Sequence, residues 1–448
     1  MRAKRCRTIF GAAAAILSIA LSLAGSSGHA QSTLTVLADR NASLTPGTQG
    51  EVSIAVDRSA PNRIVAAAMN VDDGRLLTLA SDDGGESWRR APLPLPSGAQ
   101  LHADPMVAFD TRGRAYLAVI PVAPGNEPMG IEILRSDDGG RTWSPPVRIS
   151  KAIRRDDKVA LAVDEEPRSP FRDRIHVAWK WPSGGVFHAR SHDGGVTFTR
   201  PRLVDVTRAS GLDLAVAADG QVFLAASDGE TRTMKVWRSS NGGESFAPPV
   251  AVSPVRAQWY TSQPSHCRRQ SLVHASIAAD RSDGARRGWL YLTWADYAAG
   301  TTAASCGDTC SGATACVTQV FVARSWDGGR TWTRPEVLPD QATRSDRFFP
   351  WIRVDASSGD VFLTYKDTRR DDRRIGTDVY LSRSIDGASS WEAPVRLSSE
   401  TSDASLSGFQ YGDYQGLAVA AGRVYAAWSD HRAPQDPEIF VGRAIMPR

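Results

Sequence analysis

The chain has 448 residues, of which 42% are hydrophobic, 23% charged and 8% aromatic, a composition typical of a folded globular protein and not of a disordered chain. Its 38 glycines and 26 prolines are scattered, which excludes a collagenous or low-complexity chain. The formal net charge is +4, but the first 30 residues hold four basic and no acidic groups, and the rest balances at 49 of each sign. This balance gives no general attraction for nucleic acid or for an anionic membrane.

Residues 1–30 have the pattern of a secretory signal peptide. A basic start precedes an apolar run from Ile9 to Ala24, and a small-residue cleavage site ends at Ala30. The run is too short for a spanning anchor, and no later segment of the sequence reaches about 18 apolar residues. We therefore expect a secreted or periplasmic protein in which residues 31–448 form a single domain.

One octapeptide occurs six times and is the strongest signal in the sequence. Its form is Ser-x-Asp-x-Gly-x-Ser/Thr-aromatic, and its third positions are Asp83, Asp138, Asp193, Asn241, Asp327 and Asp386. A side chain of this kind accepts hydrogen bonds from the amides of a tight turn, and the neighbouring glycines allow positive φ. The octapeptide is therefore interpreted as a hairpin turn, and these six residues as structural.

Strand-like segments surround each octapeptide. In the second unit, residues 106–109 and 115–119 predict two strands joined by a polar turn, residues 131–135 predict a third before the octapeptide, and residues 146–149 a fourth after it. Four antiparallel strands in each unit of about 50 residues predict a propeller blade.

The inner pair of strands occurs seven times, beginning near residues 52, 106, 160, 214, 276, 351 and 416. The seventh unit ends before an octapeptide or a fourth strand, whereas Leu34–Leu37 is a spare strand at the other end of the chain. Because a closed ring exposes no strand edge, we expect this N-terminal strand to complete the last blade. The prediction is an all-β propeller of seven blades, and six blades with stray strands is the alternative.

Four cysteines follow the signal-like segment: Cys267, Cys306, Cys310 and Cys316. In an oxidising compartment an even number favours two disulfides. A four-thiolate zinc site is the alternative, although the Cys-x3-Cys-x5-Cys spacing is loose for it. We expect a disulfide-stapled insertion at about residues 261–318, with Cys267 bridged to one of the other three cysteines.

The repeats resemble the Asp-box (BNR-repeat) sialidase superfamily over nearly the whole chain after residue 30. The resemblance implies that the octapeptides, or Asp boxes, lie on one face of the ring. Ligands would bind on the opposite face, among the loops that enter the first strand and leave the second strand of each blade. In this sequence those loops imply substrate-binding roles for Asp104, Asp157, Trp259, Tyr260, Phe349, Tyr411 and His431.

Two segments are similar to catalytic parts of that superfamily. Tyr414–Leu417 is similar to the last-blade segment with a nucleophilic Tyr, and Arg347–Pro350 followed by Asp367–Arg369 is similar to an arginine opening and an acid/base loop. Arginines clamp a substrate carboxylate, and a neutral Tyr attacks where a carboxylate would be repelled. The resemblance implies catalytic roles for Tyr414, Asp413, Asp367, Arg347 and Arg369.

The sequence also departs from that pattern, because the first blade opens Gly50-Glu-Val-Ser53 without an arginine. Structural roles compete with catalytic ones, since Asp367 recurs in the neighbouring blades as Asp296 and Asp430. The leading hypothesis is a sialidase-like glycoside hydrolase acting on an anionic or complex sugar. A non-catalytic glycan- or protein-binding propeller and a polysaccharide lyase are the alternatives.

A carbohydrate is the expected partner of a monomeric protein, with neither nucleic acid nor membrane as partner. The sequence predicts no cofactor and no metal site, because its histidines lack a two-His spacing. Calcium at Asp72–Asp73 or Asp156–Asp157 is left open, although neither pair lies in an oxygen-rich loop.

Overall fold

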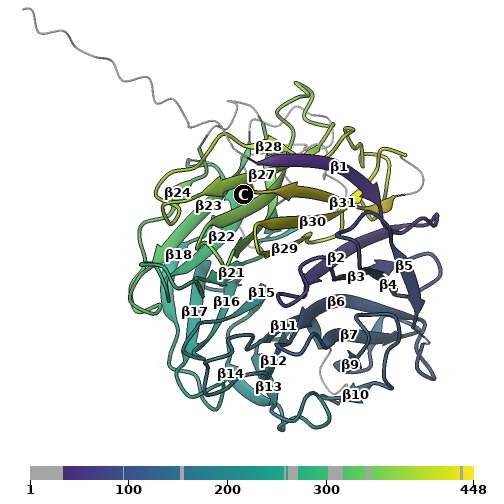
Figure 1. Cartoon of the computed structure of the whole chain (residues 1–448), viewed down its shortest axis with the longest axis vertical. Helices are drawn as coiled ribbons and strands as arrows, with labels where there is room; N and C mark the ends of the chain where they lie inside the picture. The colour runs from purple at the N-terminus through teal and green to yellow at the C-terminus, as the bar shows by residue number, and fades with distance from the viewer. Residues whose placement is uncertain are drawn as a thin grey trace, which may run out of the picture.

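Short segments with alternating apolar residues form β-strands, and these strands are arranged in a ring (Figure 1). The computed structural model describes residues 34–93, 95–151, 156–256, 259–260, 271–300, 316–339, 345–433 and 437–447, so the predicted signal peptide lies outside the described residues. Within these ranges every regular element is a β-strand, and no helix is long and apolar enough to cross a membrane. Seven four-stranded blades surround one axis, which confirms the seven-bladed propeller and rules out the six-bladed alternative.

Each blade runs from an inner strand at the axis to an outer strand at the rim, with antiparallel neighbours. The first three blades are β2 (Gln49–Val56), β3 (Ile64–Asn70), β4 (Leu77–Ser81), β5 (Arg89–Pro92); β6 (Leu101–Phe109), β7 (Ala115–Ala123), β9 (Glu132–Ser136), β10 (Val147–Arg148); and β11 (Asp157–Val163), β12 (Ile175–Lys180), β13 (Val186–Ser191), β14 (Arg202–Asp205). The next three are β15 (Ala209–Val216), β16 (Val222–Asp228), β17 (Thr233–Ser239), β18 (Val250–Pro254); β21 (Ser276–Ala279), β22 (Leu290–Tyr297), β23 (Thr318–Ser325), β24 (Glu336–Val337); and β25 (Arg347–Val354), β26 (Val361–Asp367), β27 (Asp378–Ser384), β28 (Val395–Arg396). Two short additions are β8 (Glu127–Pro128), which pairs with β7, and the pair β19 (Trp259–Tyr260) and β20 (Ser271–Leu272).

The two ends of the chain close the seventh blade. Its inner strands are β29 (Gly416–Ala420), β30 (Arg423–Asp430) and β31 (Glu438–Ile445), and its outer strand is β1 (Thr35–Asn41). In Figure 1 the purple β1 lies beside the yellow β31, with which it pairs antiparallel. The N-terminal strand therefore covers the edge of β31, as predicted.

Each Asp box forms the turn between the third and fourth strands of its blade. In blade two, Asp138 accepts hydrogen bonds from the amide and the hydroxyl of Thr142 at 2.9 and 2.6 Å, and from the hydroxyl of Ser136 at 2.7 Å. Burial works in the opposite direction, but these donors lower the pKa of Asp138 to about 2. The carboxylate of Asp138 therefore accepts these hydrogen bonds within its own turn and stabilises it.

The boxes also join neighbouring blades. Arg135, directly before the second box, donates to the carbonyl of Gly194 in the third box at 3.2 Å, and Arg190 donates to Gly243 in the fourth box at 2.9 Å. A side chain of the preceding blade packs under each turn glycine: a Cβ on Gly195 would lie 3.3 Å from the ring of Tyr116. The repeat therefore shapes the turns and holds adjacent blades together.

Blade three places a pair of buried histidines at this junction. Nδ1 of His176 lies 3.1 Å from Nε2 of His188, the rings stack, and His188 packs edge-on against Phe246 of blade four. Burial and then the charge of Arg190 lower the pKa of His188 to about 3. Burial, followed by the charges of His188, Arg174 and Arg190, lowers the pKa of His176 well below 6.5. Both rings are therefore neutral in the folded protein near neutral pH.

We expect acid to destabilise the protein through this pair. Both histidines bind protons more weakly when folded, so the free energy of unfolding should fall as the pH drops below about 6.5, by up to about 1.4 kcal/mol per pH unit for each histidine. Urea unfolding at about pH 7.5 and about pH 5.5 measures the effect. The double variant His176→Phe/His188→Val copies Phe223 and Val236, which hold the same register positions in blade four. An unchanged pH dependence in that variant would contradict the assignment.

Candidate active site

The inner strands carry a repeated irregularity near their starts. In β2, β6, β11, β15 and β25 the register with the second strand shifts, which leaves two residues unpaired as a β-bulge. In four of these bulges a residue adopts positive φ: Glu51 at 52°, Asp104 at 50°, Lys158 at 48° and Phe349 at 51°. This conformation is uncommon for residues other than glycine, and bulges often redirect side chains next to active sites.

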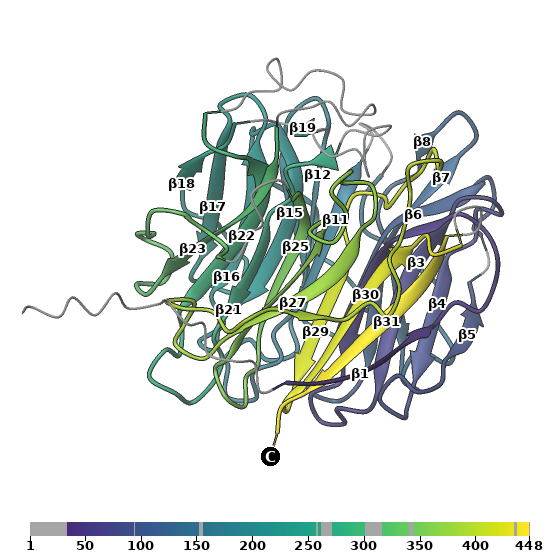
Figure 2. The same cartoon turned by 90° about the horizontal axis from the view of Figure 1, so that it is seen from above.

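The bulges lie at the end of the axis away from the Asp boxes. Gly84 of the first box bonds to Asn62, in the turn that follows the far end of β2, whereas Glu51 lies near the start of that strand. Figure 2 shows this arrangement from the side, with the C-terminus at the box face and β8 and β19 at the opposite, box-free face. The bulge residues thus lie on the side where the superfamily resemblance predicts ligand binding.

Three of these residues join an aspartate and a tyrosine in what we call the axial cluster: Glu51, Asp104, Lys158, Asp413 and Tyr414. Nζ of Lys158 lies 2.7 Å from Asp413, 2.8 Å from Asp104 and 3.5 Å from Glu51, and 5.7 Å from the ring centre of Tyr414. All five side chains are buried. Blades one, two, three and seven meet here, since the residues come from β2, β6, β11 and the segment before β29.

The charges of the axial cluster control its protonation. Burial would raise the pKa of Asp104, but the charge of Lys158 and a hydrogen bond with Glu51 lower it below its ordinary value. The carboxyl groups of Glu51 and Asp104 therefore lie close enough to share a proton. Burial would lower the pKa of Lys158, yet Asp104, Asp413 and Glu51 raise it well above 10.5.

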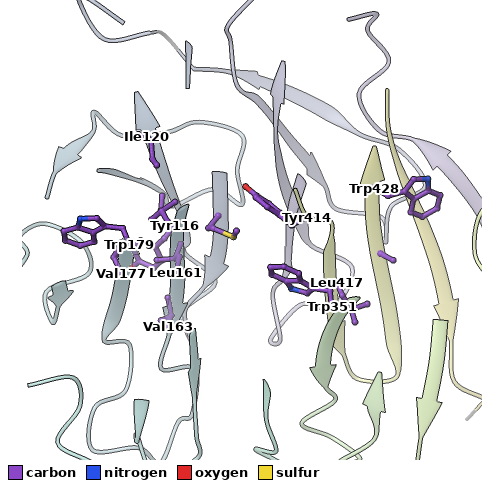
Figure 3. Close-up of a cluster of buried hydrophobic side chains, with 14 of the residues drawn as sticks. Tyr116, Ile120, Leu161, Val163, Val177, Trp179, Trp351, Tyr414, Leu417 and Trp428 are labelled. Atoms are coloured by element: carbon purple, nitrogen blue, oxygen red, sulfur yellow. The ribbon is translucent and has the colours of Figure 1, made fainter. Parts of the chain in front are cut away.

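Tyr414 forms part of an aromatic wall beside these charges. Its ring centre lies 5.7 Å from that of His274 and 6.0 Å from that of Trp351, and its hydroxyl donates to the carbonyl of Pro105 at 3.3 Å. Figure 3 shows this hydroxyl directed away from Trp351 and Leu417. Burial and then the charges of Asp104 and Glu51 raise the pKa of Tyr414 well above 10.0, so its phenol is protonated.

The imidazole of His274 fills the space that a side chain at position 211 of the neighbouring blade would occupy. Gly211 of blade four forms a bridge with His274, and a Cβ on Gly211 would lie 2.1 Å from the imidazole. Burial lowers the pKa of His274, although its hydrogen bond with the carbonyl of Ala275 at 2.8 Å acts in the opposite direction. A glycine is therefore required at position 211 for the imidazole to lie beside Tyr414.

The predicted arginines and their carboxylate lie together in blade six. Arg347 is fully buried and donates to Asp367 at 2.9 Å, and Arg369 donates to the same carboxylate at 2.8 Å. Arg347 also donates to the carbonyls of Leu338 and Pro339, which follow the outer strand of blade five. The resemblance gives Arg347 and Asp367 catalytic roles together with Tyr414, whereas in the structure they pair directly across β25 and β26 and face the rim of blade five.

The other predicted binding residues are dispersed. Asp104 is in the axial cluster, and Phe349 occupies the equivalent bulge of blade six. Asp157 pairs with Lys180 at 2.9 Å at the start of β11. Trp259 and Tyr260 form β19. Tyr411 and His431 are buried in blade seven, where their rings meet edge to face at 5.1 Å.

Among the cysteines, Cys316 is buried and disulfide-bonded, whereas Cys267, Cys306 and Cys310 lie outside the described residues. Their pairing stays a prediction. In the part of the chain that the structure describes, no three His, Cys, Asp or Glu side chains are grouped to hold a metal ion. The carboxylates considered for calcium have other contacts: Asp72 accepts the amide of Thr48 at 2.7 Å, and Asp156 accepts the indole N–H groups of Trp179 and Trp181 at 3.0 and 2.6 Å.

The sequence predictions include Asp104, Asp413 and Tyr414 but omit Glu51, Lys158 and His274. One signal was available, because each omitted residue lies two positions before the residue from which pairing with the second strand is continuous (Ser53, Ala160 and Ser276), as Tyr414 lies two positions before Gly416. The strand starts expected from the sequence, near residues 52, 160 and 276, agree with these positions to within one residue, but nothing in the sequence indicates the offset of two.

Comparisons with known proteins agree with this architecture. The sequence family described as BNR/Asp-box repeat matches residues 134–145, which contain the second box. The lectin BP39L from Burkholderia pseudomallei is 12% identical over 89% of this chain and 96% of its own, with a TM-score of 0.57. The leech intramolecular trans-sialidase is 12% identical over 84% of this chain and 71% of its own (TM-score 0.47), and the NanB sialidase of Streptococcus pneumoniae is 8% identical over 85% and 83% (TM-score 0.47).

No curated protein matches the sequence. At 12% identity and a TM-score of 0.57, the lectin structure establishes likeness of fold alone. The family match and the ring of seven blades together identify the chain as a seven-bladed β-propeller that carries BNR/Asp-box repeats.

Proposed function

We propose that this propeller is a glycoside hydrolase whose axial cluster carries out the reaction. The observation that supports this most directly is the spacing of two carboxylates around Lys158. Oxygens of Asp104 and Asp413 contact the same ammonium nitrogen at 2.8 and 2.7 Å, which keeps them within about 5.5 Å of each other. Retaining glycosidases hold their two catalytic carboxyl groups about 5–5.5 Å apart.

The roles follow from the protonation of the cluster. The hydrogen-bonded pair of Glu51 and Asp104 holds a proton that can pass to the leaving-group oxygen as the glycosidic bond breaks. Asp413, ion-paired with Lys158, supplies the carboxylate that attacks or stabilises the anomeric carbon. Water then adds at that carbon and returns a proton to the pair. Tyr414 is the alternative nucleophile, with Asp413 as the acceptor of its proton.

The charge of the cluster favours an uncharged sugar over an anionic one. Even with one proton shared by Glu51 and Asp104, the three carboxyl groups carry two negative charges against the single ammonium group, so a substrate carboxylate would be repelled. The arginines that could clamp such a carboxylate are already paired, Arg347 and Arg369 with Asp367 and Arg374 with Asp346. We therefore infer a neutral glycan as the substrate class.

A non-catalytic, glycan-binding propeller is the second candidate. It is favoured by the burial of the axial cluster, whose charges compensate one another as in a structural ion-pair network. In that case the network would fix the positions of the inner strands, and a sugar would bind at the rim of the box-free face.

A substrate screen separates these functions. Purified protein is incubated with neutral oligosaccharides, sialosides and uronate polysaccharides, and the products are analysed. We expect new reducing ends from a neutral glycan. Binding without turnover would support the second candidate, and absorbance from unsaturated products would mean a polysaccharide lyase; either result would contradict the proposed hydrolase.

We also propose that the protein is exported after removal of residues 1–30, and that Cys267 is bridged to one of Cys306, Cys310 and Cys316. The signal-like segment and the even number of later cysteines support this. Cell fractionation with N-terminal sequencing tests the export, and non-reducing peptide mapping tests the bridge. A cytoplasmic full-length chain, or a free thiol at Cys267, would contradict the respective proposal.

A further inference from the structure

The inner strands enclose a cavity of about 150 Å³ along the axis, which we call the axial channel. In each blade, one inner-strand residue at the same register position faces the channel. Its partner on the second strand packs under the next blade. Six of these seven residues are alanines, and the seventh is an arginine: Ala55, Ala108, Ala162, Ala215, Ala278, Ala418 and Arg353. Small side chains keep the channel open, and Arg353 brings a positive charge into it.

The charge of Arg353 is balanced inside the ring. Its Nη1 lies 3.3 Å from Asp213 of blade four and 3.4 Å from the hydroxyl of Ser276 of blade five. Asp213 is buried and also accepts the amide of Ile277 at 3.0 Å. Arg353 and Asp213 therefore form a pair that spans the short inner strand of blade five.

Two further arginines line the channel where it opens on the box face. Arg281 pairs with Glu165 at 2.7 Å, and Arg58 donates to the backbone carbonyl of the same residue at 3.3 Å. Among the described residues, no carboxylate lies within ion-pair distance of Arg58. More distant charges also act on it: Arg281 repels it, and Glu165, Glu166 and Asp355 attract it.

Those distant carboxylates are already engaged. Glu166 pairs with Arg287 at 3.4 Å and with Arg168 at 3.6 Å. Asp355 accepts the amides of Ser357 and Gly422 at 2.8 and 2.6 Å. The charged residues that line the channel itself are three arginines and one glutamate. Of the three arginines that line the channel, Arg353 pairs with Asp213 and Arg281 pairs with Glu165, so among the described residues Arg58 alone lacks an ion-paired carboxylate.

We propose that the box-face mouth of the axial channel binds a small tetrahedral oxyanion of the phosphate or sulfate class between Arg58 and Arg281. Guanidinium groups present planar pairs of N–H donors that match two oxygens of such an ion, and an anion would relieve the repulsion between the two arginines. The guanidinium groups at this mouth also attract anions electrostatically. This site lies at the opposite end of the ring from the axial cluster and does not depend on its chemistry.

Thermal unfolding in millimolar inorganic phosphate, at constant ionic strength, tests the site. The melting temperature of the wild type should rise with phosphate by roughly 2 °C or more well above the dissociation constant, where it should increase with the logarithm of the phosphate concentration. Arg58→Gln should lose at least half of that rise. Without phosphate, the melting temperature of this variant should differ little from that of the wild type, because no ion pair is broken and the removed repulsion from Arg281 offsets the lost attraction to Glu165, Glu166 and Asp355.

Arg373→Gln is the matched control, because it removes the same charge from a side chain that is 79% exposed and lies outside the channel. It should keep the full response to phosphate, and calorimetric titration of the wild type should give one ion per chain. Equal responses in all three proteins, or a titration that detects no bound phosphate, would overturn the proposal.

Discussion

The Glu51→Gln variant is expected to lower kcat on a hydrolysed glycan by at least about 10²-fold, the usual scale for a positioned proton-transfer group. Glutamine has nearly the same shape, but its amide cannot supply the proton that the pair of Glu51 and Asp104 holds. Initial rates at saturating substrate measure the loss. The melting temperature should change little, because the ion pairs of Lys158 with Asp104 and Asp413 are kept.

Tyr414→Phe tests the phenol separately from the carboxyl pair. If the phenol takes part in the reaction, this variant should also lose at least about 10²-fold in kcat while its ring packing is preserved. Tyr425→Phe is the matched control, because Tyr425 lies on the box face and its hydroxyl donates to the carbonyl of Pro61 at 2.8 Å. Unchanged turnover in Tyr414→Phe would remove the phenol from the mechanism, and unchanged turnover in Glu51→Gln would remove the carboxyl pair.

Lys158→Met is expected to cause the largest loss of stability, about 3–5 kcal/mol of unfolding free energy, because it leaves Glu51, Asp104 and Asp413 buried without their cation. The pKa of Lys158 is raised well above 10.5 in the folded protein, so the wild type keeps this stabilisation throughout the neutral range. In the variant the loss should shrink toward about pH 5, where the carboxylates take up protons. Urea unfolding across that pH range measures both effects.

Lys180→Met is the control for that variant. Lys180 belongs to the same blade and pairs with Asp157 at 2.9 Å, but this carboxylate is 36% exposed and remains hydrated when the lysine is removed. Its loss should be about 1 kcal/mol or less from the ion pair itself. Equal losses in the two variants would show that Lys158 does not compensate a buried charge.

The blades could be predicted from the sequence, with seven as the leading count and six as the alternative, because the information for each blade is local. Asp138 closes its turn with the hydroxyl of Ser136 and with Thr142, all within one octapeptide, and the same chemistry recurs at each box. The closure of blade seven was also predictable, since the spare first strand supplies the fourth strand that the last unit lacks. Tyr414 was singled out because Tyr414–Leu417 is similar to a last-blade segment of the superfamily, and it lies two residues before the last inner strand.

Which charged residues contact one another depends on the tertiary structure alone. Glu51, Asp104, Lys158 and Asp413 are separated by about 50 residues or more in sequence, and they touch because ring closure brings four blades to one axis. Their side chains meet through bulges, whose positions depend on strand register and not on composition. Arg347 shows the opposite case. Its motif resembles an arginine that binds a substrate carboxylate, but Asp367, its partner on the neighbouring strand, forms an ion pair with it. Sequence similarity can identify a residue type at a position, whereas the partner of a buried charge is determined by which neighbours lie within a few ångströms of it.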